Sequence, residues 1–510
     1  MRKFFTFVTL FAALFLVAIF PAAGTEKAGN SGEVRELLMI KSPGEFNVAQ
    51  YSEQQQNVFS WLKAEAAPLT PASIVTIQVS EEEMNAVNTQ ACETCGNTDG
   101  NPGKMLVGVV RDVTRTVSFR DFSPAAFNAM SPDYAGGALR EEANGGYTWT
   151  MAVESRTASA LRLHISRLNL PEGASLYIYN EDGEAFGPYN GRGPNEDGDF
   201  WTNTVTGPLA FLQLHVSGYN ASDILKGVDF DVAGIGHLGE KFLLPFLQKP
   251  GKIDENISRA ESFCSFNASC VVDASCYGTS TYPYIATHKY AVGHMQFVSG
   301  AYIYICTGGL LNNTRNDYTP YFLTANHCIS KSNEASSLEV YFQFWTSSCN
   351  GACYDPVGVC PRTIGSTIKK GSSKTGDFTL LQLSQNPPAG SVFLGWSATA
   401  IANTNGAVLY RLSHPKGAPQ AFSKHTVSTT AGVCRSWPRG KWIYSKDVIG
   451  ATEGGSSGSP VVNANGQVVG QLSGGCGTNV NDVCDTVSNA TVDGAFAAYY
   501  SLVSSFLSPL

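Results

Sequence analysis

The chain has 510 residues, of which 43% are hydrophobic, enough for two or three domains with sizeable cores. Only 15% of the residues are charged and the net charge is −8, so no basic surface supports binding to nucleic acid. The acidic balance mainly serves solubility.

The first residues have the pattern of a secretory signal peptide. A basic start, Met1 to Lys3, precedes an apolar run from Phe4 to Phe20, and small residues follow up to Gly24. A run of this length could also anchor the chain in a membrane, but its position and its small-residue end favour cleavage. We therefore expect residues 1–24 to be removed and the protein to be secreted (extracellular), with no membrane attachment afterwards.

Residues 25–259 contain alternating apolar and polar stretches but no catalytic constellation. Residues 161–165, 175–179 and 211–216 have the alternation of half-buried strands. This pattern predicts an antiparallel β-sandwich at about residues 145–235, which could serve as a binding module. The histidines of this region are expected to face solvent: His164, His215 and His237.

A domain boundary is expected near residues 247–252, where a Pro/Gly break leads into a polar stretch. Beyond it lie eleven of the 13 cysteines, a distribution that predicts disulfides in an exported chain. Cys92 and Cys95 stand apart, and without a βαβ pattern around them a local disulfide is favoured over a redox pair. Zinc is the alternative for Cys349 and Cys353, but no matching Cys/His pair lies nearby, so no metal or cofactor is expected.

The stretch Thr452 to Pro460 contains a candidate nucleophile, Ser457. Four small residues surround it and let backbone N–H groups turn toward one point beside its hydroxyl, as a tetrahedral oxyanion requires. Composition alone also allows a flexible Gly/Ser loop. Residues 454–458 also fit the nucleophile elbow G-x-S-x-G of α/β-hydrolases. In that fold the histidine must follow the serine, but the last histidine of this chain is His425. The order histidine, aspartate, serine remains open.

The base for Ser457 must come from the five histidines of this half of the chain: His288, His294, His327, His414 and His425. His327 ends an apolar strand, a fixed position from which it could accept the serine proton, although a purely structural histidine is the alternative. Asp377 precedes another apolar strand and is the expected buried carboxylate. Its nearest competitor, Asp355, lies in a Pro/Gly/Cys loop.

The nucleophile loop leads directly into a predicted hairpin. Residues 461–472 alternate around Asn465 and Gly466, a dipeptide typical of a tight primed turn. We therefore expect Ser457 to stand at the start of a barrel-type hairpin.

Four ordered motifs resemble the secreted bacterial lysyl endopeptidases of the trypsin-like family: residues 306–314, 321–328, 376–383 and 452–460. Residues 414–417, His-Pro-Lys-Gly, match a further loop of that family. The resemblance covers about residues 262–500, and residues 145–235 are similar to the propeptides of such enzymes. It implies an all-β fold, with a chymotrypsin-like double β-barrel protease domain at 260–510 preceded by a β-sandwich-like propeptide within 25–259.

The same resemblance implies roles for individual residues. His327 would be the general base, Asp377 the group that orients it and Ser457 the nucleophile, with the backbone N–H groups of Gly455 and Ser457 as the oxyanion hole. The partners would be polypeptide substrates and the chain's own propeptide, and we expect a monomer. The alternative from another class is an inactive secreted β-rich binding protein that keeps the barrels as a scaffold.

An exported protease with a long β-rich leader is expected to be a zymogen. The prosegment would cover the cleft and assist folding, and cleavage is expected between Lys249 and Arg259. Because Lys249 precedes a proline, Lys252 and Arg259 are the better sites.

The resemblance also implies disulfide pairs: Cys306 with Cys328, Cys270 with Cys476, and Cys276 with Cys349 or Cys353. The partners of four further cysteines remain open: Cys264, Cys360, Cys434 and Cys484. Because eleven is odd, one cysteine must stay a thiol or pair outside the barrels.

Specificity is where the sequence departs from its relatives. Glutamyl endopeptidases with a similar serine loop use a threonine at the place of Thr452 and a histidine at the place of Ser473, so this chain lacks the histidine for an acidic substrate. Lysyl endopeptidases place an aspartate beyond a cysteine. Counting from Cys476 leads to Asp485, whereas counting back from the next family strand leads to Thr491 and an uncharged pocket.

We therefore predict cleavage after Lys, or after Lys and Arg, through Asp485, with Thr452 and Ser473 also in the pocket and Asp482 as a second candidate. A trypsin-like protease with a different side-chain preference remains the alternative.

Overall fold

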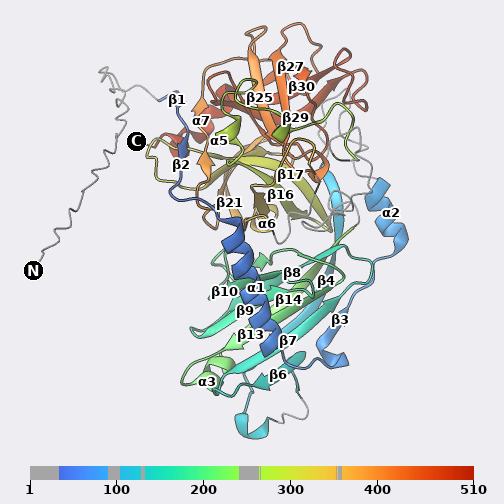
Figure 1. Cartoon of the computed structure of the whole chain (residues 1–510), viewed down its shortest axis with the longest axis vertical. Helices are drawn as coiled ribbons and strands as arrows, with labels where there is room; N and C mark the ends of the chain where they lie inside the picture. Colours follow the sequence, from blue (N-terminus) through green and yellow to red (C-terminus); the bar gives the residue numbers. More distant parts are fainter. Residues whose placement is uncertain are drawn as a thin grey trace, which may run out of the picture. The chain divides into compact units, whose positions relative to one another are not determined.

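The structure, a computed structural model, describes residues 34–89, 104–127, 132–239, 264, 266–351, 353 and 359–509. It is mostly β-strand (Figure 1). The expected signal peptide, the Cys92 and Cys95 pair, the expected processing segment 249–259 and Asp355 lie outside the described residues. Among the helices that the structure describes, none is both long enough and apolar enough to cross a membrane.

The strands between residues 74 and 238 form two sheet regions that share one core. The first contains β3 (Ile74–Thr76), β5 (Asp133–Tyr134), β6 (Gly137–Glu141), β7 (Tyr147–Glu154), β9 (Ala174–Tyr179), β10 (Ala185–Tyr189) and β13 (Leu209–Val216). The second contains β4 (Met105–Ser118), β8 (Ala160–Asn169), β11 (Phe200–Trp201), β12 (Val205–Thr206) and β14 (Asp229–Leu238). Apolar side chains from both, such as Trp149, Leu161 and Phe230, are fully buried in one cluster.

Helices add a further layer to this region. α1 (Val48–Glu65) crosses β9 and β13 (Figure 1) and buries Leu62 against Tyr179 and Ala185. Asn47 caps the helix by accepting a hydrogen bond from the Gln50 amide at 3.0 Å. The smaller helices are α2 (Glu81–Thr89) and α3 (Ala221–Lys226).

The prediction that three strand histidines face solvent is wrong for two of them. His164 is half-buried beside Asp199, but His215 and His237 are only 7% and 0% exposed. The ring of Trp61 from α1 stacks on His215 with 4.1 Å between centroids, and His237 contacts the Ser155 hydroxyl at 2.8 Å. Strand alternation indicates which face a residue occupies but not what covers that face.

A second row of strands runs from residue 292 to residue 383. It contains β16 (Val292–Ser299), β17 (Tyr302–Leu311), β18 (Tyr321–Ala325), β19 (Glu339–Phe342), β20 (Arg362–Ile364), β21 (Ser366–Ser372) and β22 (Phe378–Leu383). Their order in space is β20-β19-β16-β17-β18-β22-β21. Gly365, with φ +79, is the only residue between β20 and β21. The helices α5 (Ile285–His288) and α6 (Ser332–Ser336) flank this row.

The last strands close into a six-stranded barrel. They are β25 (Val408–Ser413), β26 (Ala421–Val427), β27 (Trp442–Ile449), β28 (Pro460–Val462), β29 (Val468–Gly477) and β30 (Asn489–Ala495). Their order is β29-β28-β25-β26-β27-β30, and β30 pairs back onto β29. β15 (Val272–Asp273) pairs with β26, and the C-terminal helix α7 (Phe496–Leu507) follows β30.

The hairpin that follows the nucleophile loop has a longer turn than the sequence predicts. The Asn463 amide donates to the Gln467 carbonyl and the Gly466 amide to the Asn463 carbonyl, at 2.9 and 3.0 Å. Only Gly466 has a positive φ there, whereas a two-residue primed turn centred on Asn465 and Gly466 needs a positive φ at Asn465. The hairpin is confirmed and its tight primed turn is wrong.

Residues 34–239 make several contacts with the later strands. β4 pairs antiparallel with β17, which joins the two rows into one sheet, and β1 (Glu36–Leu37) and β2 (Ile40–Lys41) pair with β24 (Trp396–Ser397) and β23 (Val392–Phe393). The fully buried Glu339 accepts hydrogen bonds from Asn203, from Thr204 and from Arg362. A buried carboxylate satisfied from both regions makes this contact sensitive to the loss of any one partner.

The disulfides confirm two of the expected pairs and correct one. Cys306 pairs with Cys328, and Cys276 with Cys349. Cys270, expected to pair with Cys476, is bonded instead to Cys484, because it packs with Val483 whereas Cys476 packs with Trp437 in a different cluster. The remaining pairs are Cys434 with Cys476 and Cys264 with Cys353. Cys360 is buried, and its thiol lies 3.9 Å from the Gln343 carbonyl.

Candidate active site

The loop around Ser457 is held by glycines where no side chain would fit. Gly455 has φ +94, and a Cβ there would lie 2.9 Å from the His414 carbonyl oxygen. Gly458 has φ +82, and its Cβ would collide with the Thr324 side chain. Both positions therefore require glycine for its conformation and for space. The backbone N–H groups of Gly455 and Ser457 have no hydrogen-bond partner among the described residues.

Glu453 anchors the same loop to the segment that begins this half of the chain. Its carboxylate, with the residue only 9% exposed, accepts from the Asn267 side chain at 2.7 Å and from the Ala268 amide at 3.1 Å. Lys416 lies 2.9 Å from it and neutralises its charge. The buried carboxylate of Glu453 is therefore both hydrogen-bonded and neutralised, and it can hold the backbone shape of the loop.

Ser457 lies against the strand row that carries His327. The Thr307 amide donates to the Ser457 carbonyl at 2.8 Å, and Cys328 Sγ lies 3.8 Å from the same oxygen. Since Cys328 follows His327 directly and is bonded to Cys306, this contact brings the nucleophile loop beside the histidine.

His327 and Asp377 form a direct pair. His327 Nδ1 lies 2.7 Å from Asp377 Oδ2, and the His327 amide donates to Oδ1 at 2.9 Å. Asp377 is 3% exposed and has φ +49 just before β22, and its carbonyl accepts from the Gln471 side chain at 3.1 Å. The carboxylate therefore fixes the orientation of the imidazole, with a proton on Nδ1 and the other nitrogen left as the base.

The second ring nitrogen of His327 has no partner. Nε2 is buried and makes no hydrogen bond in the part of the chain that the structure describes, to Ser457 Oγ or to any other group. Catalytic hydrogen bonds are often long before substrate binds and shorten in the complex, so this geometry suits a general base.

None of the other histidines of this half contacts Asp377 among the described residues, although three of them also carry unpartnered ring nitrogens: His288, His294 and His414. His288 contacts the Tyr282 hydroxyl, His414 Nδ1 donates to the Ala418 carbonyl at 2.9 Å, and His294 lies among Tyr341, Phe344 and His414. Burial lowers the pKa of His288 to about 3 and that of His414 to about 4. His425 binds an aspartate of its own, Asp447.

A cavity of about 100 Å³ opens beside Ser457. The three residues predicted for substrate binding, Thr452, Ser473 and Asp485, all line it. Ser473 is buried, and its hydroxyl accepts a hydrogen bond from Trp442 Nε1 at 3.2 Å. The cavity is the natural place for the substrate side chain that precedes the scissile bond.

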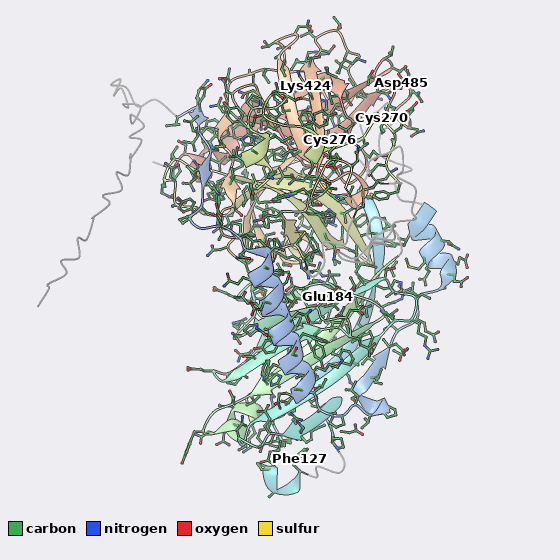
Figure 2. The ribbon with its side chains drawn as sticks, viewed as in Figure 1. Phe127, Glu184, Cys270, Cys276, Lys424 and Asp485 are labelled. Carbon is green, nitrogen blue, oxygen red and sulfur yellow. A yellow bond between two sulfur atoms is a disulfide. The ribbon has the colours of Figure 1, made fainter. Side chains whose placement is uncertain are left out.

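Asp485 stands at the exposed end of this cavity, next to the Cys270 disulfide (Figure 2). Its carboxylate accepts from the amides of Ser488 and Val487 at 2.8 and 3.1 Å and from Asn479 at 2.9 Å. These hydrogen bonds, that from Ser488 first, lower the pKa of Asp485 to about 2. Most of its hydrogen-bonding capacity therefore serves its own loop.

Sequence reasoning missed two further carboxylates in the cavity wall, namely that of Glu453, which Lys416 neutralises, and that of Asp447 on β27. Asp447 lies opposite His425 in the β26–β27 ladder, and its Oδ1 is 2.7 Å from His425 Nδ1 and 2.6 Å from Thr491 Oγ1. The available signal was an acidic residue in an apolar strand that leads into the nucleophile loop. The spacing of the motifs could not show which wall it faces.

Comparison with known proteins places these features in context. A family model described as lysyl endopeptidase, C-terminal domain, matches residues 266–489. A lysyl endopeptidase from Pseudomonas aeruginosa is 33% identical over 369 residues, covering 69% of this chain and 72% of that protein. Secreted RxLR effector protein 73 from Plasmopara viticola is 25% identical over 341 residues, covering 64% of this chain and 77% of that protein.

Solved protease structures match at lower similarity. The Rv3671c protease of M. tuberculosis in its active form has 15% identity and a TM-score of 0.31, with coverage of 47% of this chain and 90% of that one. The HtrA-type protease AlgW has 15% identity and a TM-score of 0.30, with coverage of 44% and 62%.

Proposed function

Since the chain belongs to the lysyl endopeptidase family, we propose that it is a secreted serine endopeptidase that hydrolyses peptide bonds through His327, Asp377 and Ser457. One observation carries the proposal: a buried His327–Asp377 pair stands beside a glycine-shaped serine loop whose two amides have no partner among the described residues. These are the parts that acyl transfer needs, namely an oriented base, a nucleophile and donors for the oxyanion.

The reaction follows from these positions. Ser457 Oγ attacks the scissile carbonyl while His327 Nε2 accepts its proton, and the amides of Gly455 and Ser457 hold the oxyanion. Asp377 stabilises the imidazolium that forms. His327 then donates its proton to the leaving amine, and water repeats the two steps on the acyl enzyme. The closed glycine turns keep the two donors preorganised, so they need no rearrangement during the reaction.

The proposed substrates are polypeptides cut after Lys, or after Lys and Arg. Three carboxylates line the cavity beside Ser457: Asp447, Glu453 and the sequence-derived candidate Asp485. Lys416 neutralises that of Glu453, and the described lining contains no basic side chain. Both features support a cationic side chain at that place.

We propose that residues 1–24 are the signal peptide, 25–259 a propeptide with a β-sandwich, and 260–510 a double-barrel protease domain. The strand row closed through Gly365 and the six-stranded ring support the two barrels. The β4–β17 pairing and the buried Glu339 contacts support a prosegment that helps its protease domain to fold. Five disulfides in the later region support secretion.

A fluorophosphonate probe tests the nucleophile. The purified protein should be labelled at Ser457, and Ser457→Ala should lose labelling and lower kcat by about 10⁴- to 10⁶-fold. Ser501→Ala, which changes an exposed serine of α7, is the matched control and should behave as the wild type. Unlabelled Ser457 in protein that is folded and processed would contradict the proposal.

N-terminal sequencing of the secreted form tests the zymogen. It should begin after Lys252 or Arg259. A mature chain that begins near residue 25 would contradict processing while leaving the nucleophile untouched.

A further inference from the structure

We propose that Asp447 is the residue that recognises the cationic side chain of the substrate, at the inner wall of the cavity beside Ser457. The proposal rests on the proposed function, because it assigns a group within the same site. It names a position that neither of the two sequence alignments, to Asp485 or to Thr491, contains.

Three strands bring this carboxylate to the cavity. Asp447 of β27 lies opposite His425 of β26, and Ser445, two residues earlier on the same face, lies opposite Thr491 of β30. Asp447 and Thr491 both line the cavity, and the side chain of Asp447 is 11% exposed. The carboxylate is therefore mostly buried but open to the space in which a substrate side chain would lie.

One oxygen of Asp447 is already used and the other is available. Oδ1 takes both contacts, with His425 Nδ1 at 2.7 Å and with Thr491 Oγ1 at 2.6 Å. Oδ2 makes no hydrogen bond with any described residue. It is also absent from the set of fully buried polar atoms that lack a partner. The pair of contacts holds the carboxylate plane while Oδ2 remains free for a ligand.

The buried carboxylates around Asp447 outnumber the guanidinium groups. Both ring nitrogens of His425 are engaged, because Nδ1 lies 2.7 Å from Asp447 Oδ1 and Nε2 lies 2.7 Å from the Ser423 hydroxyl. The nearby cation Arg411 is fully buried and paired with Asp493. Two carboxylates therefore face one guanidinium, and an ammonium or guanidinium from the substrate would balance the remaining charge.

The ionised state of Asp447 agrees with this arrangement. Burial alone would raise the pKa of Asp447, but its contact with His425, the hydroxyl of Thr491 and the charge of Arg411 together lower it. The carboxylate is thus an anion at neutral pH, whatever its depth in the wall.

The walls between Asp447 and Ser457 suit a long side chain. Trp437 lines the cavity and offers an apolar surface to the methylene groups of Lys or Arg. Gly475, opposite Thr491 in the β29–β30 ladder, adds no side chain of its own to this wall. A substrate side chain with an aliphatic stem and a terminal cation would match an apolar wall that ends at a carboxylate.

Asp447→Asn is the sharpest test. Asn keeps the oxygen that accepts from Thr491 and has the same shape, but it removes the charge. Peptides that differ only in Lys, Arg, Gln, Leu or Glu before the cut would be compared in kcat/KM. We expect cleavage after Lys and Arg to fall by about 10²- to 10⁴-fold, and cleavage after Leu or Gln to change little. Asp317→Asn, the same change in a carboxylate that does not line the cavity, is the matched control and should keep the wild-type ratio of Lys to Leu cleavage.

A second measurement needs no variant at Asp447. Butylammonium, the side chain of lysine without its backbone, should slow fluorophosphonate labelling of the wild type, and 1-butanol at the same concentration should not. Normal labelling with no protection by butylammonium would overturn the role of Asp447 and leave the nucleophile proposal standing. So would an Asp447→Asn protein that is labelled normally and retains the wild-type Lys to Leu ratio.

Discussion

Two histidine–aspartate pairs with the same contact serve different parts of the site. His327 Nδ1 and His425 Nδ1 each lie 2.7 Å from an aspartate oxygen, of Asp377 and Asp447 respectively. The rings differ at the other nitrogen. His327 Nε2 has no partner among the described residues, whereas His425 Nε2 is bonded to the Ser423 hydroxyl.

The difference teaches how one motif acquires two roles. In the proposed mechanism, the carboxylate of the first pair orients the ring so that the ring can move a proton. In the proposed pocket, the ring of the second pair and Thr491 orient the carboxylate, so that the carboxylate can bind a cation. Each pair leaves one polar atom without a partner among the described residues, on the histidine in the first pair and on the aspartate in the second. We expect the residue that carries this atom to act on the substrate.

Breaking the first pair should have the largest effect. Asp377→Asn removes the carboxylate that holds His327 in its tautomer, and kcat should fall by about 10⁴-fold for every substrate. Steady-state rates on the five-peptide panel would measure this. A loss confined to Lys and Arg substrates would contradict the assigned roles, since uniform loss is what distinguishes a group in the proton pathway from one in the pocket.

Acid should destabilise the protein through a buried histidine that has no carboxylate partner among the described residues. His414 is buried with only a backbone carbonyl as partner, and burial lowers its pKa to about 4, below the value of about 6.5 in an unfolded chain. Between these values the unfolded chain binds more protons, so the free energy of unfolding falls as the pH falls from about 6.5 to 4. His414 alone would contribute a loss of about 3 kcal/mol.

Denaturant titrations of the wild type and His414→Gln at pH 7 and pH 4 would check this. The variant should be less stable at pH 7 and show the smaller drop between the two values. Equal drops in both proteins would show that His414 does not cause the acid sensitivity.

A change in the second pair should alter preference without stopping catalysis. His425→Gln removes the ring that aligns Asp447, so kcat/KM for Lys substrates should fall by about tenfold while Leu substrates keep their rate. Parallel assays with both peptides would show the split. Faster Lys cleavage in the variant would instead indicate that His425 is charged and competes with the substrate for Asp447.

The smallest effect is expected at the rim of the cavity. Asp485→Asn should change the Lys to Leu ratio by less than about twofold, because its oxygens already accept from the amides of its own loop. The loss of these charge-assisted bonds should loosen the loop locally. Hydrogen exchange of residues 479–489 would report the loosening, and a large loss of Lys preference would return the specificity role to Asp485.

Many of the strands and the candidate site residues could be predicted from the sequence alone. Local alternation predicted the strands that became β8, β9 and β13, because side-chain period reports a half-buried sheet directly. The order of four motifs selected His327 and Asp377, which the structure brings to hydrogen-bonding distance. The pairing of Cys306 with Cys328 was also accessible, since both cysteines belong to these motifs.

Only the tertiary structure shows which side chains are covered by other elements and which residues lie opposite one another in neighbouring strands. The docking of Trp61 helps to bury His215, and the loop after β29 brings Cys484, rather than Cys476, to Cys270. Asp447 reaches the cavity because β26, β27 and β30 align it with His425 and Thr491, residues 22 and 44 positions away in the chain. Such contacts depend on sheet closure, a long-range property that local pattern and motif spacing do not encode.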